Sequence, residues 1–391
     1  MNDEAETLLR DGDAHYAAGR FDAAAQAYRA AFGLSPRNLA AGFNVGNALK
    51  QAGRPREAIA AYDAVLAIAP DFAIARHNRA TCLLQVGDLG DGFREYEWRK
   101  GCPGFVDDAR YGLERPWRGE EIAGKTLFVY PELFQGDLIQ FGRYAVMAER
   151  LGARVILGAP RTMHALLSTM SPTLTLVDSE GPAPDYDYNV ALMTLPAMFG
   201  TTLETVPRAG RYLQAQPERV ARWRERLGTE GVKVGIAWQG SANAAQRSFP
   251  LALAAERLAA VPGVRLISLQ KVNGLEQLAA LPPGLVQDLG DDFDPGPDAF
   301  VDTAAAMMAC DLFISADTSV VHVAGGLGRP TWLATTTPAD WRWLEDRVDS
   351  PWYPSLRIFR QPAPGDWAGL FDRMAQTLQA TLAARGNAAG G

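Results

Sequence analysis

Hydrophobic and polar positions follow two different rhythms along the chain, and the change falls near residue 100. Before it, small, aromatic and proline positions recur every 34 residues. The recurring sets are Gly12, Gly46 and Ala80; Gly19, Gly53 and Gly87; Tyr28, Tyr62 and Tyr96; and Pro36 and Pro70. Small residues suit the place where two helices cross, glycine suits the turn between them, and proline ends a unit. The pattern predicts three helix pairs, of which the third, 73–99, is degenerate because Gly92 stands where Ala24 and Ala58 stood.

Helix pairs with this period are typical of the tetratricopeptide repeat, in which each pair leaves an apolar face bare until its neighbour covers it. The third pair ends in REYEWRKG, with the aromatic residues Tyr96 and Trp98 at alternate positions, and we expect it to cap the array and dock on the next domain. A short array of this kind serves either as a spacer or dimerisation piece, or as a groove for a peptide or protein. The repeats alone leave both uses open.

After Gly101 the rhythm changes to short apolar runs punctuated by Gly and Pro. The runs predicted as strands are 125–130, 153–158, 173–178, 188–193, 232–238, 264–270, 285–290, 311–316 and 330–335. Helical segments lie between most of them, and this alternation predicts parallel sheets with helices on both faces. The predicted fold class is therefore α/β behind an all-α N-terminal part. Its expected domains are the repeats at 1–100, a Rossmann-like half at 101–210 and a second such half at 211–391.

The composition narrows the class of partner. The chain of 391 residues has a formal net charge of −7 and no dense Lys/Arg run, which argues against nucleic acid and anionic membranes as partners. Its three cysteines, Cys82, Cys102 and Cys310, have no paired spacing and suit a reducing compartment. The acidic start MNDEAET lacks the features of a signal peptide, and no apolar run approaches the length of a membrane span. We therefore expect a cytoplasmic protein.

Polar residues gather in the loops after the predicted strands, where open parallel sheets bind their ligands. The first such loop reads PELFQGDLIQFGRY, in which Gly136 and Asp137 precede a predicted helix. Asp137 is either an N-cap residue that accepts bonds from the first N–H groups of that helix, or a general base for an acceptor hydroxyl. The sequence leaves the two alternatives open, because only geometry shows whether a substrate is within reach.

Three further loops carry candidate ligand contacts. Gln239 follows the strand at 232–238, and further along the same loop Arg247 either pairs with phosphate oxygens or lies solvated on the surface. Gln270, Lys271 and Glu276 follow the strand at 264–270 and suit a base edge and a ribose, or are simple surface polarity.

The last candidate loop lies in ISADTSVVHVAGGLGRPTW, 314–332. Here Asp317, Thr318 and Ser319 are predicted to begin a helix, whose N–H groups and positive dipole end suit a pyrophosphate. His322 falls about one turn into that helix and is either a structural group or a donor to a phosphate or sugar hydroxyl. No G-x-G-x-x-G or P-loop pattern follows a predicted strand, which argues against dinucleotide and P-loop sites.

Residues from about 105 to 385 resemble the heptosyltransferase-like glycosyltransferases of family 9, particularly those fused behind tetratricopeptide repeats. Each matching motif is weak alone, but their combination and order are specific. The motifs are REYEWR (94–99), the Gly136-Asp137 turn with DLIQFGRY, GIAWQG with RSFPL (247–251), SLQK (268–271), VDTAA (301–305), ISADTSVVHVAGGLGRPTW and DWRWLEDRVDSPWYPSLRIFRQ (340–361).

The resemblance implies a GT-B fold of two Rossmann-like halves and an inverting, metal-independent transfer of a sugar from a nucleotide sugar, with no cofactor. It makes Asp137 the base. It assigns the donor contacts to Gly136, Gln239, Arg247, Gln270, Lys271, Glu276, Asp317, Thr318, Ser319 and His322. One departure is that the glycine-rich approach to the base reads Leu133-Phe134-Gln135 here, so bulky side chains reshape the acceptor side.

Acceptor identity depends on the use of the repeats. In proteins of this architecture the repeats are thought to present a protein acceptor, flagellin in some, whose Ser or Thr hydroxyls take the sugar. The alternatives are an envelope glycan or lipid acceptor, and a scaffold whose transferase fold is inactive. Trp341 and Arg342 belong to an aromatic-rich segment that either packs between domains or faces the sugar or base. The pairs Asp185/Asp187 and Asp292/Asp294 are weak candidates for binding a cation.

Overall fold

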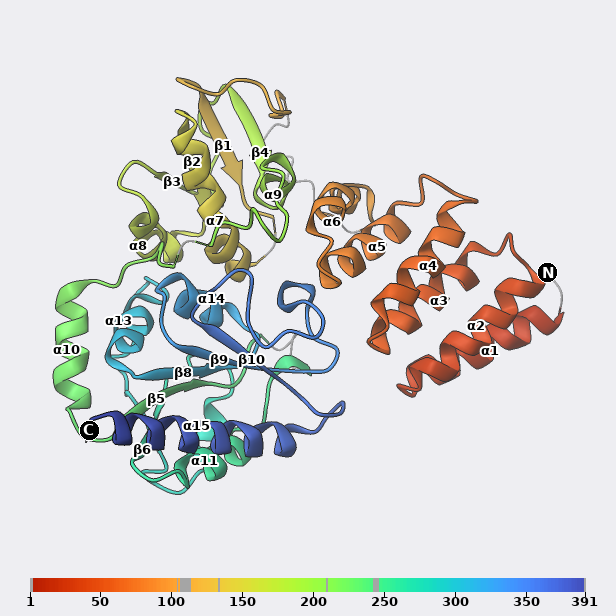
Figure 1. Cartoon of the computed structure of the whole chain (residues 1–391). Helices are drawn as coiled ribbons and strands as arrows, with labels where there is room; N and C mark the ends of the chain where they lie inside the picture. The colour runs from red at the N-terminus through yellow and green to blue at the C-terminus, as the bar shows by residue number, and fades with distance from the viewer. Residues whose placement is uncertain are drawn as a thin grey trace. The chain divides into compact units, whose positions relative to one another are not determined.

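The computed structural model describes residues 3–103, 105, 114–132, 134–208, 210–241 and 246–389 (Figure 1). Leu133, part of the predicted approach to the base, lies outside them. The chain forms two compact units. The first unit contains Met1–Asp108, Pro196–Val206 and Pro338–Arg347, and the second contains Ala109–Leu195, Pro207–Thr337 and Val348–Gly391. No helix among the described residues is long and apolar enough to cross a membrane.

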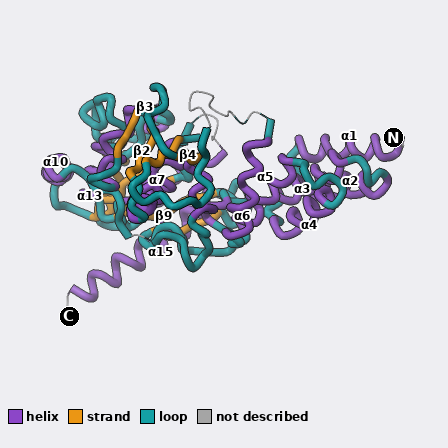
Figure 2. Tube along the Cα trace, turned by 90° about the horizontal axis from the view of Figure 1, so that it is seen from above, coloured by secondary structure: helices purple, strands orange, loops and turns teal. Residues whose placement is uncertain are grey.

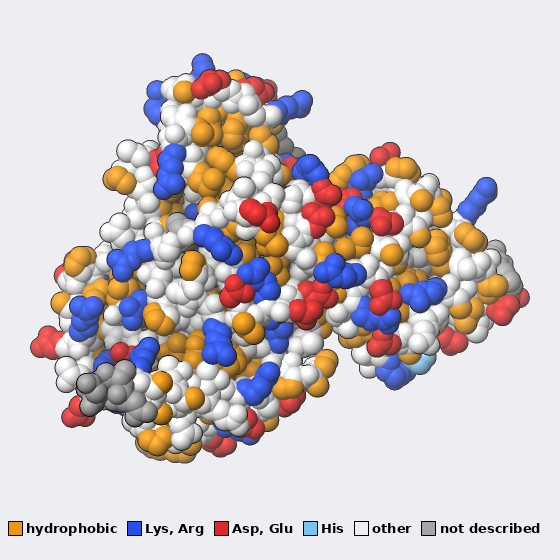
Figure 3. Space-filling view, viewed as in Figure 1, with side chains coloured by type: hydrophobic (Ala, Val, Ile, Leu, Met, Phe, Trp, Pro, Cys, Tyr) orange, Lys and Arg blue, Asp and Glu red, His pale blue; other side chains and the backbone are white. Residues whose placement is uncertain are grey.

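The predicted helix pairs are confirmed in the first unit. They are α1 (Asp3–Ala17) with α2 (Phe21–Leu34), α3 (Leu39–Gln51) with α4 (Pro55–Leu66), and α5 (Ala73–Gln85) with α6 (Leu89–Tyr96), which the turn η1 (Glu97–Gly101) follows. The repeated small residues lie at the crossings, because a Cβ on Gly46 would come within 2.4 Å of the Tyr62 ring. The Tyr62 hydroxyl in turn donates to Asn47 Oδ1 at 2.8 Å. Figure 3 shows charges of both signs interspersed over the face in view.

A late segment of the chain closes the third pair. The backbone N–H of Glu345 donates to the Gln85 carbonyl at 2.9 Å, and Gln85 Nε2 donates to the Ala339 carbonyl at 3.4 Å. The ring of Trp341 lies 5.8 Å from that of Phe93, edge to face, and 6.2 Å from that of Tyr96. Arg342 donates to Asp340 Oδ1 at 2.9 Å and lies 4.3 Å over the Trp341 ring. Trp341 and Arg342 are therefore packed within the first unit.

The second unit contains two parallel sheets, which confirms the predicted fold class. The first sheet has the order β3-β2-β1-β4. Its strands are β1 (Thr126–Tyr130), β2 (Arg154–Ala159), β3 (Thr175–Asp178) and β4 (Tyr188–Ala191). Leu127, Phe128 and Val129 of β1 are fully buried because β1 is a central strand, paired in parallel on both sides. Helix α7 (Gln135–Arg150) connects β1 to β2, and the short helices α8 (His164–Leu167) and α9 (Leu195–Met198) follow β2 and β4.

The second sheet has the order β10-β9-β8-β5-β6-β7. Its strands are β5 (Val232–Ala237), β6 (Val264–Ser268), β7 (Val286–Gln287), β8 (Leu312–Ser315), β9 (Thr331–Thr335) and β10 (Leu356–Arg360). The sequence prediction missed β10, which contains two arginines and a partly polar pattern. The helices α11 (Leu251–Ala259) and α15 (Trp367–Ala389) cover one face, where Leu258 and Phe371 join the core around Ile236.

A buried carboxylate ties α10 (Pro217–Leu227) to α13 (Val301–Ala309), which lie side by side in Figure 2. Asp302 accepts hydrogen bonds from Arg219 at 2.9 Å, Arg222 at 2.5 Å and Trp223 Nε1 at 2.9 Å. Burial alone would raise the pKa of Asp302, but the bonds from Trp223 and Arg219 hold it below its usual value. Asp294 accepts from the backbone N–H of Asp302 at 2.6 Å, so this acidic turn holds the start of α13.

The glycine positions of the repeats give a direct test of the packing. Gly46→Ala places a methyl group against the Tyr62 ring and should lower the free energy of unfolding by about 1–3 kcal/mol. The matched control is Gly33→Ala on α2, where nothing lies within 4 Å, and it should stabilise by roughly 0.5–1 kcal/mol through helix propensity. Thermal and urea unfolding of the full chain, followed by circular dichroism, measures both. Equal effects of the two substitutions would contradict the packing argument.

Candidate functional site

Loops from three neighbouring strands meet at one edge of the second sheet. The strands β8, β5 and β6 lie next to one another and run parallel, so their carboxyl ends share an edge. Backbone hydrogen bonds join the loops directly where the strands end. The N–H of Ala316 donates to the Ala237 carbonyl at 2.9 Å, and that of Leu269 donates to the Ile236 carbonyl at 2.9 Å. The predicted donor residues of the second half all follow these three strands.

Gln270 holds two of these loops together. Its Oε1 accepts from the backbone N–H groups of Trp238 and Gln239 at 2.9 and 3.0 Å. Its Nε2 donates to the carbonyls of Gln239 and Asn273 at 2.7 and 2.8 Å. A glutamine amide offers two donors and two acceptor lone pairs, so all four are used. The structure therefore gives Gln270 a positioning role and leaves no bond for the base edge that the sequence suggested.

The rest of the loop after β6 is more open. Lys271 Nζ donates to the Phe293 carbonyl at 2.5 Å, and Glu276 lies exposed on α12 (Leu275–Ala279). Gln239 Oε1 accepts from Gln277 Nε2 at 2.9 Å, which ties the β5 loop to α12. Val272, which the sequence did not single out as a site residue, has a φ of 72° and is 77% exposed. A β-branched residue in the left-handed region is strained, and no sequence signal marks this position.

Arg247 is tethered by a buried carboxylate. Its Nη1 lies 3.5 Å from Oδ2 of Asp317, whose side chain is 4% exposed, while that of Arg247 is 39% exposed. The other N–H groups of this guanidinium bond to none of the described residues. Arg247 is thus held at the carboxyl edge of the sheet with donors to spare, an arrangement suited to an anion.

Helix α14 (Ser319–Gly326) begins at the same edge, two residues later than predicted. Thr318 is its N-cap residue, and the Thr318 hydroxyl is buried with no hydrogen-bond partner among the described residues. The β5 loop approaches closely, since a Cβ on Gly240 would lie 3.1 Å from Thr318 Cγ2. The first N–H groups of α14 have no partner within the helix and can receive an anion.

The start of α7 lies against α14. Helix α7 begins at Gln135 with Phe134 as its N-cap residue, so Asp137 lies within the first turn and not at the N-cap, which was one of the two alternatives for it. Asp137 is 7% exposed. A Cβ on Gly136 would lie 3.1 Å from His322 Cδ2 and 3.6 Å from Ser319 Oγ, so the first turn of α7 lies close against α14. The structure therefore brings Gly136 and Asp137 together with Ser319 and His322, nearly two hundred residues away.

His322 is held by Tyr353. The Nδ1 atom of His322 lies 2.9 Å from the Tyr353 hydroxyl, and both residues are buried. Burial raises the pKa of Tyr353 well above its usual value, so its hydroxyl stays protonated. The Cδ2–Nε2 edge of the ring faces Gly136. When the Tyr353 hydroxyl donates to Nδ1, the imidazole proton lies on Nε2 at this edge. Tyr353 belongs to the aromatic-rich segment after Trp341, and the sequence did not indicate its contact with His322.

Arg143 fixes the same helix further along. Its guanidinium donates to the carbonyls of Gln140, Trp352 and Pro207 at 2.7, 3.0 and 3.1 Å and to the Tyr212 hydroxyl at 2.9 Å. It also lies 4.3 Å over the Tyr212 ring. Arg143 is 3% exposed, and none of its described partners is a carboxylate. A buried cation with neutral acceptors is a feature that the sequence marks only as an arginine within an apolar helix.

Two residues of the acidic pairs, Asp187 and Asp294, have structural roles. Asp187 Oδ2 accepts from the backbone N–H of Thr126 at 2.8 Å, and Asp294 holds α13. In the part of the chain that the structure describes, no group of three or more His, Cys, Asp or Glu side chains is placed to hold a metal ion.

Residues 9–71 and 43–97 match the family model of the tetratricopeptide repeat. The chain is also 29% identical over 342 residues to Protein FlbA of Caulobacter vibrioides, a match that covers 78% of this chain and 55% of FlbA. This chain thus spans about half the length of that curated relative.

Two solved structures align with the larger part of the chain. The E. coli ADP-heptose LPS heptosyltransferase II matches 66% of this chain and 99% of its own, with a TM-score of 0.46 and 15% identity. The glycosyl transferase family 9 structure from Veillonella parvula matches 62% of this chain and 88% of its own, with a TM-score of 0.43 and 14% identity. Similarity at this level does not carry a function from either protein to this chain.

The buried guanidinium of Arg143 gives a test of how the start of α7 is held. Arg143→Met leaves the Trp352 and Pro207 carbonyls without their donor and should lower the free energy of unfolding by roughly 3 kcal/mol. Arg150→Met on the exposed last turn of the same helix should change it by less than about 0.5 kcal/mol. Unfolding followed by tryptophan fluorescence measures both. An Arg143→Met variant with an unchanged free energy of unfolding would show that these bonds are dispensable.

Proposed function

We propose that this chain is a glycosyltransferase that moves a sugar from a nucleotide-sugar donor to a hydroxyl acceptor, with inversion at the anomeric carbon. The observation that carries the proposal is the contact between the first turn of α7 and α14, which joins Gly136 to Ser319 and His322. Inverting transfer requires a base at the acceptor hydroxyl and groups that stabilise the departing phosphate. The α7 side of this contact supplies the base, and the α14 side supplies groups that stabilise the phosphate.

The donor phosphates are assigned to the carboxyl edge of the second sheet. Arg247 has N–H donors to spare, and the first N–H groups of α14 lie beside the buried hydroxyl of Thr318. Together they would neutralise a leaving diphosphate without a metal ion, because charge-assisted hydrogen bonds and a helix N-terminus both favour an anion. The open loop with Lys271 and Glu276 is the proposed place for the nucleoside.

In the proposed reaction the Asp137 carboxylate takes the proton of the acceptor hydroxyl. The acceptor oxygen then forms a bond to the anomeric carbon on the face opposite the phosphate. The bond between that carbon and the phosphate oxygen breaks, and the electron pair leaves with the nucleotide. His322 Nε2–H and Arg247 donate to the phosphate oxygens as negative charge develops there.

The acceptor is proposed to be a Ser or Thr hydroxyl of a protein that binds the repeats. Two features support a protein acceptor: the array of helix pairs in the first unit and the exposed apolar side chain next to the base. Phe134, the N-cap residue of α7, is 67% exposed, so its ring is available to an acceptor that approaches Asp137.

The base assignment is tested on the full chain, after a thermal-shift screen of nucleotide sugars has identified a donor. Asp137→Asn should reduce transfer at least about 100-fold, because the amide cannot take the proton. The donor nucleotide should still raise the melting temperature as it does for the unsubstituted protein, since phosphate binding lies on α14. The control is Asp185→Asn, an exposed carboxylate of the same half, which should leave transfer unchanged.

Two results would contradict the assignment of Asp137. Transfer that survives in Asp137→Asn would exclude it as the base. Loss of nucleotide binding in the same variant would show that the substitution disturbs α14 and not proton transfer alone. Transfer to a glycan or lipid acceptor, and not to protein, would overturn the acceptor while leaving the base assignment intact.

A further inference from the structure

We propose that Val272, in the loop after β6, is the side chain on which the base of the donor nucleotide packs. The inference rests on the proposed function, which puts the nucleoside at this loop, and it names a residue that no sequence motif marks. Two features of the molecule carry it. The backbone of Val272 lies in the left-handed region, and its apolar side chain is exposed to solvent.

Val272 forms the apex of a tight γ-turn. The backbone N–H of Asn273 donates to the Lys271 carbonyl at 3.0 Å, and Val272 between them has a φ of 72°. A γ-turn with a positive φ at its central residue is the rare and strained form of this turn. A β-branched residue is among those least suited to the left-handed region. The loop therefore holds Val272 in an unfavourable conformation.

Hydrogen bonds on the far side of the turn keep Val272 in this conformation. Gln270 Nε2 donates to the Asn273 carbonyl at 2.8 Å. Trp238 Nε1 donates to the Gly274 carbonyl at 3.1 Å. These bonds fix the two residues that follow Val272, so the surrounding structure imposes the strain. Strain that the surroundings impose in this way is concentrated at active sites and at loops that hold ligands.

The side chain that the turn presents is apolar and points away from the protein interior. Among the described residues, no large hydrophobic side chain is more exposed than Val272, and Leu275, three positions later, is 42% exposed. A single exposed valine is ordinary. A valine held outward in a strained turn is not, because glycine would form the same turn without the strain. We conclude that the position depends on its apolar side chain.

The loop lies at a suitable separation from the proposed phosphate site. That site is at Arg247 and the start of α14, which follows β8, and the order of neighbouring strands is β8-β5-β6. Adjacent strands lie about 4.8 Å apart, so the ends of β8 and β6 are roughly 10 Å apart. A ribose joins a phosphate to its base over a separation of this order. The base of a nucleotide held at β8 would therefore reach the loop after β6.

The polar side chains of these loops favour contact with the face of the base and not with its edge. Backbone groups use all four hydrogen bonds of the Gln270 amide, and Gln239 Oε1 already accepts from Gln277 Nε2. The flat face of every nucleobase is largely apolar, and packing Val272 against it removes apolar surface from water. Val272 thus contributes affinity whichever base the donor carries.

The test uses the full chain and the 5′-monophosphates and 5′-diphosphates of adenosine, guanosine, cytidine and uridine, with binding measured by isothermal titration calorimetry. Val272→Ala should weaken the tightest-binding nucleotide of this panel at least about fivefold, because two methyl groups lose their contact with the base. Val272→Ile keeps a β-branched apolar side chain and should bind that nucleotide as the unsubstituted protein does. Inorganic pyrophosphate, which has no base, should bind equally to all three proteins.

Val272→Gly separates ligand contact from folding. Glycine adopts a positive φ without strain, so this variant should melt roughly 1–3 °C higher than the unsubstituted protein when no nucleotide is present. It should nevertheless bind the nucleotide at least about fivefold more weakly. A residue that served only the fold would not combine a gain in melting temperature with a loss of binding.

The matched control is Val348→Ala. Val348 is 66% exposed, and its carbonyl accepts from the backbone N–H of Ile358 on β10, which is separated from β6 by three strands of the sheet. This substitution should leave nucleotide binding unchanged.

Three results would overturn the role of Val272 and leave the proposed phosphate site in place. They are unchanged nucleotide affinity in Val272→Ala or Val272→Gly, equal weakening by Val348→Ala, and a protein that binds pyrophosphate as tightly as any nucleotide of the panel. A different result would count against the proposed function itself. If neither pyrophosphate nor any of these nucleotides binds at millimolar concentration, the proposed donor site is wrong, and the role of Val272 is wrong with it.

Discussion

The arrangement of the candidate site depends on the close approach of Gly136 on α7 to Ser319 and His322 on α14. A Cβ at this position would lie 3.1 Å from Cδ2 of His322, so a side chain here would require the ring to move by a few tenths of an ångström. The approach joins α7, which follows strand β1 of the first sheet, to α14, which follows strand β8 of the second sheet. The first turn of α14, whose N–H groups favour an anion, lies on one side of this contact. Asp137 follows Gly136 in the chain, which is why we propose it as the base at this contact.

The contact is supported from behind by a buried cation. Arg143 lies on α7, as Gly136 does, and donates hydrogen bonds to three carbonyls and a tyrosine hydroxyl. A guanidinium without a carboxylate is costly to bury, so it persists only where such acceptors surround it. Tyr353 lies 4.8 Å under the same guanidinium and holds His322. Arg143, Tyr353 and His322 therefore form one chain of contacts that fixes α7 relative to α14.

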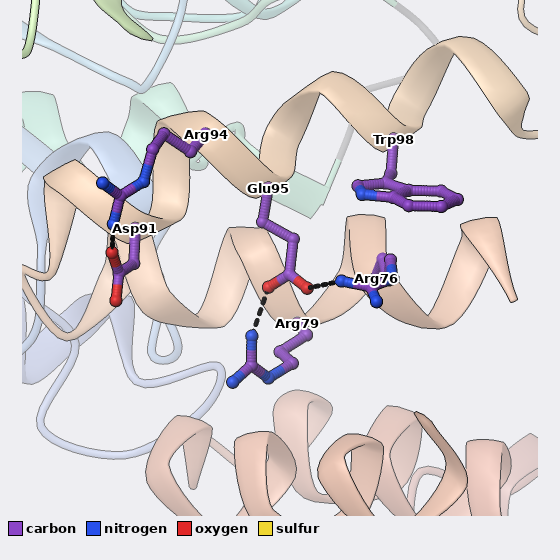
Figure 4. A pocket seen from close by; sticks show the side chains of 6 residues that line it. All are labelled: Arg76, Arg79, Asp91, Arg94, Glu95 and Trp98. Carbon is purple, nitrogen blue, oxygen red and sulfur yellow. Dashed lines mark hydrogen bonds and ion pairs between the residues drawn. The ribbon is translucent and has the colours of Figure 1, made fainter. Parts of the chain in front are cut away.

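In the first unit a buried carboxylate has a comparable role with a different outcome. Glu95 accepts hydrogen bonds from Arg76 and Arg79 and fixes the positions of their guanidinium groups. Asp302 in the second unit is instead enclosed by Arg219, Arg222 and Trp223. The difference is geometric. The partners of Asp302 close over it to join two helices, while those of Glu95 line a pocket of about 280 Å³ (Figure 4). A buried acid with two arginines thus joins two helices in both places, fully enclosed in one and at the edge of a pocket in the other.

The sequence by itself determined the classes of structure, because they follow from local periods. The 34-residue repeat of Gly12, Gly46 and Ala80 predicted the helix pairs, and the apolar runs predicted every strand except β10. It also placed Asp137, Arg247 and Asp317 in loops at strand ends. Only the tertiary structure decided what these residues meet. Gln270 proved to be saturated by backbone groups, Asp137 lies inside a helix, and Tyr353 acquires its role from His322 on another element. The physical reason is that a period encodes which face is buried, whereas hydrogen-bond saturation and close approach depend on atoms that folding brings together.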